Sequence, residues 1–147
     1  MRLPVGGLIA LLIFTPVAGL ALDASPGLWE LTTRVDIPKL PFGLTVPTNL
    51  PLPQSGTRSV CVTKKDVKDP RDVVRMQTGC QLETFDDANK EVIWTATCQG
   101  PPRSRSRGKL SFKDEALAGT AVVNTDIQGF ELPVSLSYHG RRAGECQ

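Results

Sequence analysis

The residues that could carry acid–base chemistry near neutral pH lie close together near the C-terminus. His139 is the only histidine of the chain, and Ser135 and Ser137 precede it at alternate positions. Alternate side chains of a strand share one face, so a histidine base could reach a serine nucleophile there. No sharp turn presents either serine, however, and no oxyanion loop follows. We therefore expect a solvated histidine, assign no catalytic residue, and rank a hydrolase last among the functions considered.

The sequence offers no motif for a metal ion or an organic cofactor. No nucleotide-binding glycine loop, GxSxG pattern or HExxH pattern occurs beyond the N-terminal apolar segment. The four cysteines, Cys61, Cys80, Cys98 and Cys146, lack the two-residue spacing of zinc ligands. We expect neither a metal nor a cofactor, and the even number of cysteines predicts two disulfides.

Four cysteines allow three pairings, and the sequence leaves the choice open. We favour Cys61–Cys80, which would clamp the segment between two strand ends, together with Cys98–Cys146, which would fix the C-terminus to a central strand. The alternative joins Cys80 to Cys98, which lie at similar distances from a predicted hairpin turn, and leaves Cys61 for Cys146. Each disulfide would stabilise the domain by about 3–4 kcal/mol on loop-closure grounds.

Two further sets of side chains could contact a ligand. Trp29 and Trp94 could line an apolar cavity inside a curved sheet, although large aromatic residues more often form plain core. Arg103, Arg105 and Arg107 belong to the segment RSRSR, which we place in a connecting loop, and they could contact an anionic surface. No aromatic residue alternates with these arginines, so the stacking platform typical of nucleic-acid binding is missing.

The N-terminal segment, residues 1–21, has the features of a secretory signal peptide. It carries the basic residue Arg2, an apolar run, and small residues before a cut after Ala21, with Ala24 as the later alternative. The remaining domain, residues 22–147, then holds 16 basic and 15 acidic residues, because one of the 17 basic residues leaves with the leader. This balance gives no electrostatic attraction to nucleic acid. We expect no transmembrane span after cleavage.

Alternation of apolar and polar residues predicts a β domain. In GLWELTTRVDI, Trp29 and Leu31 share one face, and similar alternation predicts two hairpins and a final strand in CQLETFDDANKEVIWTATC, GKLSFKDEALAGTAVVNT and FELPVSLSYH. Prolines make residues 38–56 a surface loop, and a capping pattern predicts one short, broken helix near residues 63–76. Because so little helix cannot cover a sheet, we predict a single antiparallel sheet that curves into a half-barrel, a barrel or a sandwich.

Several landmarks occur in order along the chain. They are PGLWE, PKLPFG, VCVTKKDVKDPR, a hairpin bounded by cysteines, GKLSF with LAGTAVV, and the terminal GRRAGEC. Over about residues 25–146 this series resembles the bacterial exported family named domain of unknown function 3617. The chain departs from the family pattern by a longer proline-rich insert and by RSRSR. The resemblance implies a periplasmic or surface-exposed location in a Gram-negative bacterium, and it implies no activity.

The sequence therefore predicts a non-enzymatic periplasmic or secreted domain with a binding role. Its one-sided strands and sparse helix favour an apolar small molecule, a lipid or an envelope protein as the partner. The alternative is a structural or assembly module of the cell envelope, which the predicted disulfides and the missing catalytic motifs would suit. A nucleic-acid partner is not expected.

Overall fold

The computed structural model describes residues 24–78, 80–87 and 90–147, so the predicted signal peptide at residues 1–21 lies outside the described residues. Seven strands in the described part pair side by side into one antiparallel sheet with the order β2-β1-β7-β6-β5-β4-β3. Their bounds are β1 Gly27–Asp36, β2 Gly56–Val62, β3 Gln81–Asp86, β4 Glu91–Cys98, β5 Ser104–Lys113, β6 Ala116–Ile127 and β7 Phe130–Gly144. Among the described residues no helix is long and apolar enough to cross a membrane.

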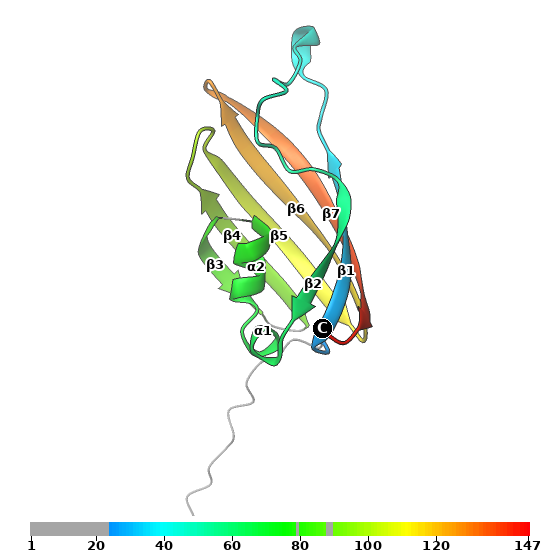
Figure 1. The fold of residues 1–147 in the computed structure, drawn as a ribbon. Helices are drawn as coiled ribbons and strands as arrows, with labels where there is room; N and C mark the ends of the chain where they lie inside the picture. Colours follow the sequence, from blue (N-terminus) through cyan, green and yellow to red (C-terminus); the bar gives the residue numbers. More distant parts are fainter. Residues whose placement is uncertain (1–23, 79, 88–89) are drawn as a thin grey trace, which may run out of the picture.

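The sheet is curved and open, with β2 and β3 at its two edges (Figure 1). Strands β3 to β7 follow one another as a meander, and the first strand, β1, joins by pairing with the last strand, β7. The prediction of a mainly β domain built on one curved antiparallel sheet is confirmed. Of the three shapes considered, the half-barrel is the one that the structure adopts.

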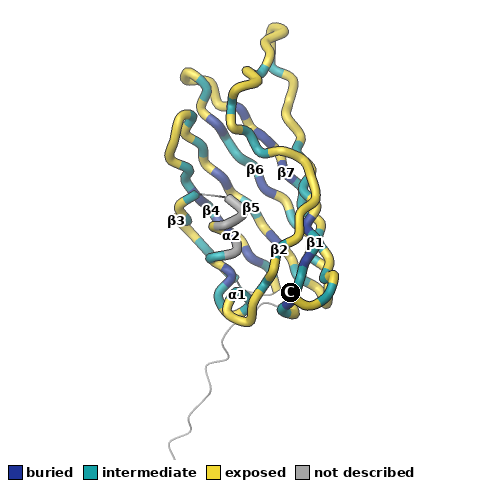
Figure 2. Tube along the Cα trace, in the orientation of Figure 1, coloured by how far each residue is buried: buried dark blue, intermediate teal, exposed yellow. Residues whose placement is uncertain are grey.

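The inner, concave face of the sheet carries most of the core. Strand β1 buries Trp29 and Leu31, and strand β7 buries Leu132, Val134 and Leu136, in each case at alternate positions. Alternate positions share a face because the strand repeats every two residues. In Figure 2 the buried segments accordingly recur along the middle of the sheet, while turns and edges are exposed.

Two short helices follow β2, where the sequence predicted one broken helix. Thr63 caps α1 (Lys64–Lys68) by accepting from the N–H of Asp66, and the Asp66 carboxylate accepts from the N–H of Thr63. The chain leaves helical geometry at Asp69, as expected for a residue before proline. Helix α2 (Arg71–Thr78) then crosses the inner face of the sheet (Figure 1) and contributes Val74, which is 2% exposed, to the core.

The proline-rich loop 38–56 leaves the sheet after β1 and returns to β2. Its outer turn is a 3-10 helix, η1 (Pro41–Gly43), which stands beyond the ends of the strands (Figure 1). Most residues of the loop are exposed. On the returning limb, however, Pro51, Leu52 and Pro53 line a pocket against the inner face. The same loop therefore has an exposed tip and a limb that covers part of the sheet.

The structure corrects the favoured disulfide connectivity. Cys61 is bonded to Cys146, and Cys80 is bonded to Cys98, which is the alternative pairing. The register explains the second bond, because Gln81 pairs with Thr97 and so brings the neighbouring cysteines opposite each other. For the first, β1 lies between β2 and β7, a strand order that alternation alone does not reveal, and the tail after β7 crosses its end to reach β2.

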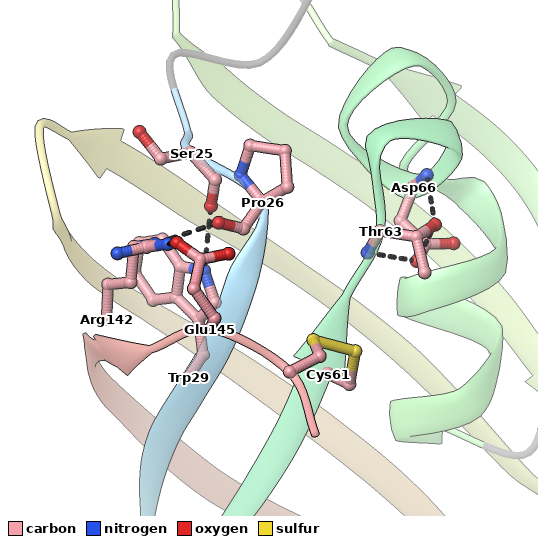
Figure 3. Close-up of a disulfide and its surroundings, with 9 residues drawn as sticks. Ser25, Pro26, Trp29, Cys61, Thr63, Asp66, Arg142 and Glu145 are labelled. Carbon is pink, nitrogen blue, oxygen red and sulfur yellow. Dashed lines mark hydrogen bonds and ion pairs between the residues drawn. A yellow bond between two sulfur atoms is a disulfide. The ribbon is translucent and has the colours of Figure 1, made fainter.

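An arginine ties the two ends of the domain together beside the Cys61–Cys146 bond (Figure 3). Arg142 on β7 donates from Nε to the carbonyl oxygen of Pro26 at 2.8 Å and forms ion pairs with Glu115 and Glu145. The guanidinium passes so close to Gly27 that a Cβ there would lie 2.6 Å from Nε. The glycine that opens β1 thus makes room for the arginine that anchors it.

We expect the two disulfides to contribute unequally to stability. Their sequence separations are 85 residues for Cys61–Cys146 and 18 for Cys80–Cys98. Loop-closure entropy then predicts losses of about 4.5 and about 3 kcal/mol on replacing each pair by alanine. Urea unfolding of the two double variants should show the larger loss for Cys61→Ala with Cys146→Ala. Non-reducing peptide mapping that recovered a Cys61–Cys80 peptide would contradict the connectivity itself.

Candidate functional site

The inner face holds a pocket of about 480 Å³ beneath the returning limb of the proline-rich loop. We call it the inner pocket. Strands β4 to β7 form its floor, and its rim consists of residues 51–53, the β4–β5 turn at residues 100–102, and the Cys80–Cys98 disulfide. The volume lies in the range of about 300–1,000 Å³ that is typical of small-molecule sites. The second disulfide therefore holds one wall of the pocket.

The floor of the inner pocket is made of apolar and small side chains. Trp94, Ala121, Leu136 and Val123 line it, and they share a face because they occupy inward positions on adjacent strands. Trp94 lies across Gly108 on the next strand, where a Cβ would stand 2.6 Å from the ring atom Cη2. Only glycine allows the indole to approach β5 this closely.

Two buried polar atoms of residues that line the pocket have no hydrogen-bond partner. Among the described residues, the buried side-chain atoms in this condition are Trp94 Nε1 and Ser106 Oγ. Both residues are 2% exposed, and both line the inner pocket. They lie on neighbouring strands, since Ser106 pairs with Ala96, two residues after Trp94. An unpaired buried polar atom costs about 1–3 kcal/mol. Both atoms are covered by neighbouring protein atoms, so a polar ligand atom would reach them only after those neighbours shift.

The two tryptophans have different surroundings, although the sequence alone does not distinguish them. Trp29 donates from Nε1 to the carbonyl oxygen of Ser25 at 3.0 Å and packs edge-to-face against Phe112, with ring centroids 6.4 Å apart. Together with Val74 it lines a small apolar void of about 50 Å³ under α2. Trp29 is therefore satisfied core, whereas Trp94 reaches both this void and the inner pocket.

The three arginines lie on the opposite face of the sheet. Contrary to the prediction of a loop, the segment enters strand β5 at Ser104, so Arg105 and Arg107 project outward at alternate positions. Pairing of Ser104 with Cys98 extends the ladder into this segment. With Arg103 they line a shallow polar hollow of about 660 Å³ that also contains the carboxylates Asp126 and Glu131. The carboxylates offset part of the positive charge, and none of these groups belongs to the inner pocket.

His139 also lies outside the pocket. It occupies an exposed, outward position on β7, opposite Thr32 of β1 and Ala118 of β6. Within the described residues it forms no hydrogen bond with Ser135 or Ser137. The structure therefore brings Trp94 to the pocket and leaves His139 and the three arginines elsewhere.

Ser106 and Tyr138 line the inner pocket but were not among the candidate residues predicted from the sequence. Inward positions on β5 are Ser104, Ser106, Gly108 and Leu110 in succession, so small and polar residues replace large ones where the pocket lies. That succession is a usable signal for a hollow in the core. The contribution of residues 51–53, in contrast, depends on how the loop folds back, and periodicity carries no information about that.

Burial of the Tyr138 ring raises the pKa of its hydroxyl, and the nearby positive charge of Arg58 opposes the shift in part. The pKa of the unfolded chain should be the ordinary value of about 10. Because the unfolded state then loses its proton first, the free energy of unfolding should fall as the pH rises through about 10 and level off above the folded pKa.

Tyr138 is the only tyrosine, so tyrosinate absorbance reports this one group. We expect a higher titration midpoint in the native protein than in denaturant, and no tyrosinate signal in Tyr138→Phe. Equal midpoints in the two states would show that the hydroxyl is fully solvated, against the buried position described above.

A comparison with protein families matches residues 24–146 to the family described as protein of unknown function (DUF3617). No curated protein and no solved structure matches the chain. The match covers nearly all of the described domain. It runs from Ala24, shortly before β1, to Cys146 of the long-range disulfide. The chain belongs to the DUF3617 family.

Proposed function

We propose that the protein binds an amphiphilic small molecule in the inner pocket. The observation that carries the proposal is the pair of buried, unpartnered atoms Trp94 Nε1 and Ser106 Oγ in the wall of a pocket of about 480 Å³. The apolar part of the ligand would lie against Ala121, Val123 and Leu136. Its polar group would accept a hydrogen bond from the indole N–H and exchange one with the serine hydroxyl.

The location of these two atoms favours a ligand over a purely structural explanation. In a core with no binding role, the polar positions would more favourably hold apolar residues, because each unpaired atom costs about 1–3 kcal/mol. A ligand oxygen would recover that cost on binding. The neighbouring Trp29 shows that this fold can satisfy a buried indole by a backbone carbonyl, so the state of Trp94 is not forced by the sheet.

The compartment we propose is the periplasm or the exterior of the cell. Both disulfides join cysteines of the folded domain, and the described residues contain no free cysteine. Disulfides persist in oxidising compartments and are rare where thiols are kept reduced. Amphiphiles in such a compartment include lipids and their breakdown products, which suit a pocket with an apolar floor and a polar wall.

Adjacent positions on β6 provide a matched test of the pocket. Val123 lines the inner pocket and Val122 faces the outer hollow, and both are half-buried. Val123→Phe should weaken binding of a fluorescent fatty acid by about tenfold or more, or about 1.4 kcal/mol, because the ring occupies the ligand's volume. Val122→Phe should bind the probe as the wild type does.

The same preparations should be extracted and examined by mass spectrometry for co-purified amphiphiles. Equal probe binding by the Val123→Phe and Val122→Phe variants, with no molecule in the extract, would remove the basis for a pocket ligand. An envelope module without a small-molecule site would then be the better description.

Ser106→Ala separates binding from stability. Removing an unpaired buried hydroxyl should leave the free energy of unfolding unchanged or raise it by about 1 kcal/mol. The same change should weaken probe binding several-fold, because the ligand's polar group loses its partner. Denaturant unfolding and probe titration on one preparation measure both quantities. A large loss of stability would instead mean that the hydroxyl has a structural partner.

A further inference from the structure

The tip of the proline-rich loop, residues 41–44, exposes large apolar side chains. Phe42 is 98% exposed and Leu44 is 64% exposed, and the tip stands clear of the sheet (Figure 2). Exposed apolar residues scattered singly are ordinary on protein surfaces, but a projecting apolar tip is typical of a contact site. Removing such side chains from water would be favourable, so the tip has a driving force for contact with an apolar phase.

The charged residues of the loop indicate which kind of apolar phase the tip contacts. Between Asp36 and Arg58 the only charged residue is Lys39, and the segment contains no acidic residue. A surface that enters a bilayer must bring few charges into the hydrocarbon and benefits from a cation at the headgroup level. The loop has this composition, whereas rims of protein–protein contacts are usually rich in polar and charged groups.

The backbone holds the tip in a defined shape. Phe42 has φ 59° and ψ 24°, a left-handed conformation that is uncommon for an aromatic residue, and Gly43 follows with φ 69°. The N–H of Leu44 donates to the carbonyl oxygen of Pro41 at 3.3 Å, and proline fixes φ at that position. A turn that is already ordered loses little conformational entropy when its side chains are buried.

The tip and the rim of the inner pocket lie at the same end of the molecule. The end of β1 pairs with residues near the start of β7, so the proline-rich loop leaves the sheet at the end where the β6–β7 turn lies. The N–H of Asp126 donates to the carbonyl oxygen of Arg103, which places the β4–β5 turn beside the β6–β7 turn. Phe130 of the latter turn is 45% exposed. Residues 51–53 of the same loop line the pocket. Contact at the tip therefore brings the pocket rim toward whatever the tip touches.

We infer that Phe42 and Leu44 insert into the surface of a lipid bilayer and so dock the loop end of the domain onto it. The membrane contact itself does not require an occupied pocket. Only the step from bilayer to pocket rests on the proposed function, in which the bilayer would be the source or destination of the amphiphile.

The test is sedimentation of the protein with vesicles of phosphatidylglycerol and phosphatidylcholine. The protein is expressed from the full sequence and purified in the form that the expression host produces. Phe42→Asn with Leu44→Gln removes the apolar tip, and asparagine tolerates the left-handed backbone at the first position. We expect vesicle binding to fall about tenfold or more relative to the wild type, because two buried apolar side chains are lost. High salt should change wild-type binding little, because the insertion is mainly hydrophobic.

Two controls separate this inference from the proposed function. Ile93→Ser removes an exposed apolar residue on β4, 48% exposed and away from the tip, and should leave vesicle binding unchanged. Val123→Phe should lose the fatty-acid probe and keep vesicle binding. Equal vesicle binding by the tip variant and the wild type would overturn the inference. A tip variant that changes only the oligomeric state of the protein, measured by analytical ultracentrifugation, would overturn it in favour of contact between copies of the chain.

Discussion

A single open sheet with one apolar face is stable in water only if something covers that face, and this requirement organises the whole domain. Helix α2 covers one part of the concave face, where Val74, Val92 and Trp94 belong to one buried cluster. The returning limb of the proline-rich loop covers another part with Pro51, Leu52 and Pro53. An eight-residue helix and an extended limb are narrower than the sheet they cover. The inner pocket lies under the limb, and its described lining includes no residue of α2.

The position of both covers depends on the pairing of the first strand with the last. Strand β1 enters the sheet between β2 and β7, and β2 leads directly into the helices. Closing that long-range pairing costs chain entropy, which the Cys61–Cys146 bond reduces in the unfolded chain. Arg142 of β7 adds a second link, because it donates to the carbonyl oxygen of Pro26 just before β1. The ends of the chain thus determine where the cover of the inner face is anchored.

Much of this fold could be predicted from the sequence, because alternation in a strand is a local property. Strands, hairpins, the capped helix start at Thr63 and the curvature needed to cover one face all follow from neighbouring residues. The disulfide connectivity was predicted wrongly in its favoured form, because it depends on β1 lying between β2 and β7. The arginines were misplaced for a related reason, since only the pairing of Ser104 with Cys98 shows that β5 begins there. The pocket requires knowledge of what folds over the sheet, which neither periodicity nor composition supplies.

The two tryptophans differ in their surroundings, and under the proposed function this difference separates stability from recognition. At the helix end, Trp29 has its indole N–H satisfied by Ser25 and its ring packed on Phe112. At the loop end, the N–H of Trp94 is unpaired, its ring fills the space at Gly108, and the unpaired hydroxyl of Ser106 lies on the next strand. The unpaired buried atoms lower stability, and the two disulfides offset that cost at opposite edges of the sheet. Among the described residues the unpaired buried side-chain atoms are confined to Trp94 and Ser106, and such a local departure within an otherwise reinforced fold is the pattern expected of a binding site.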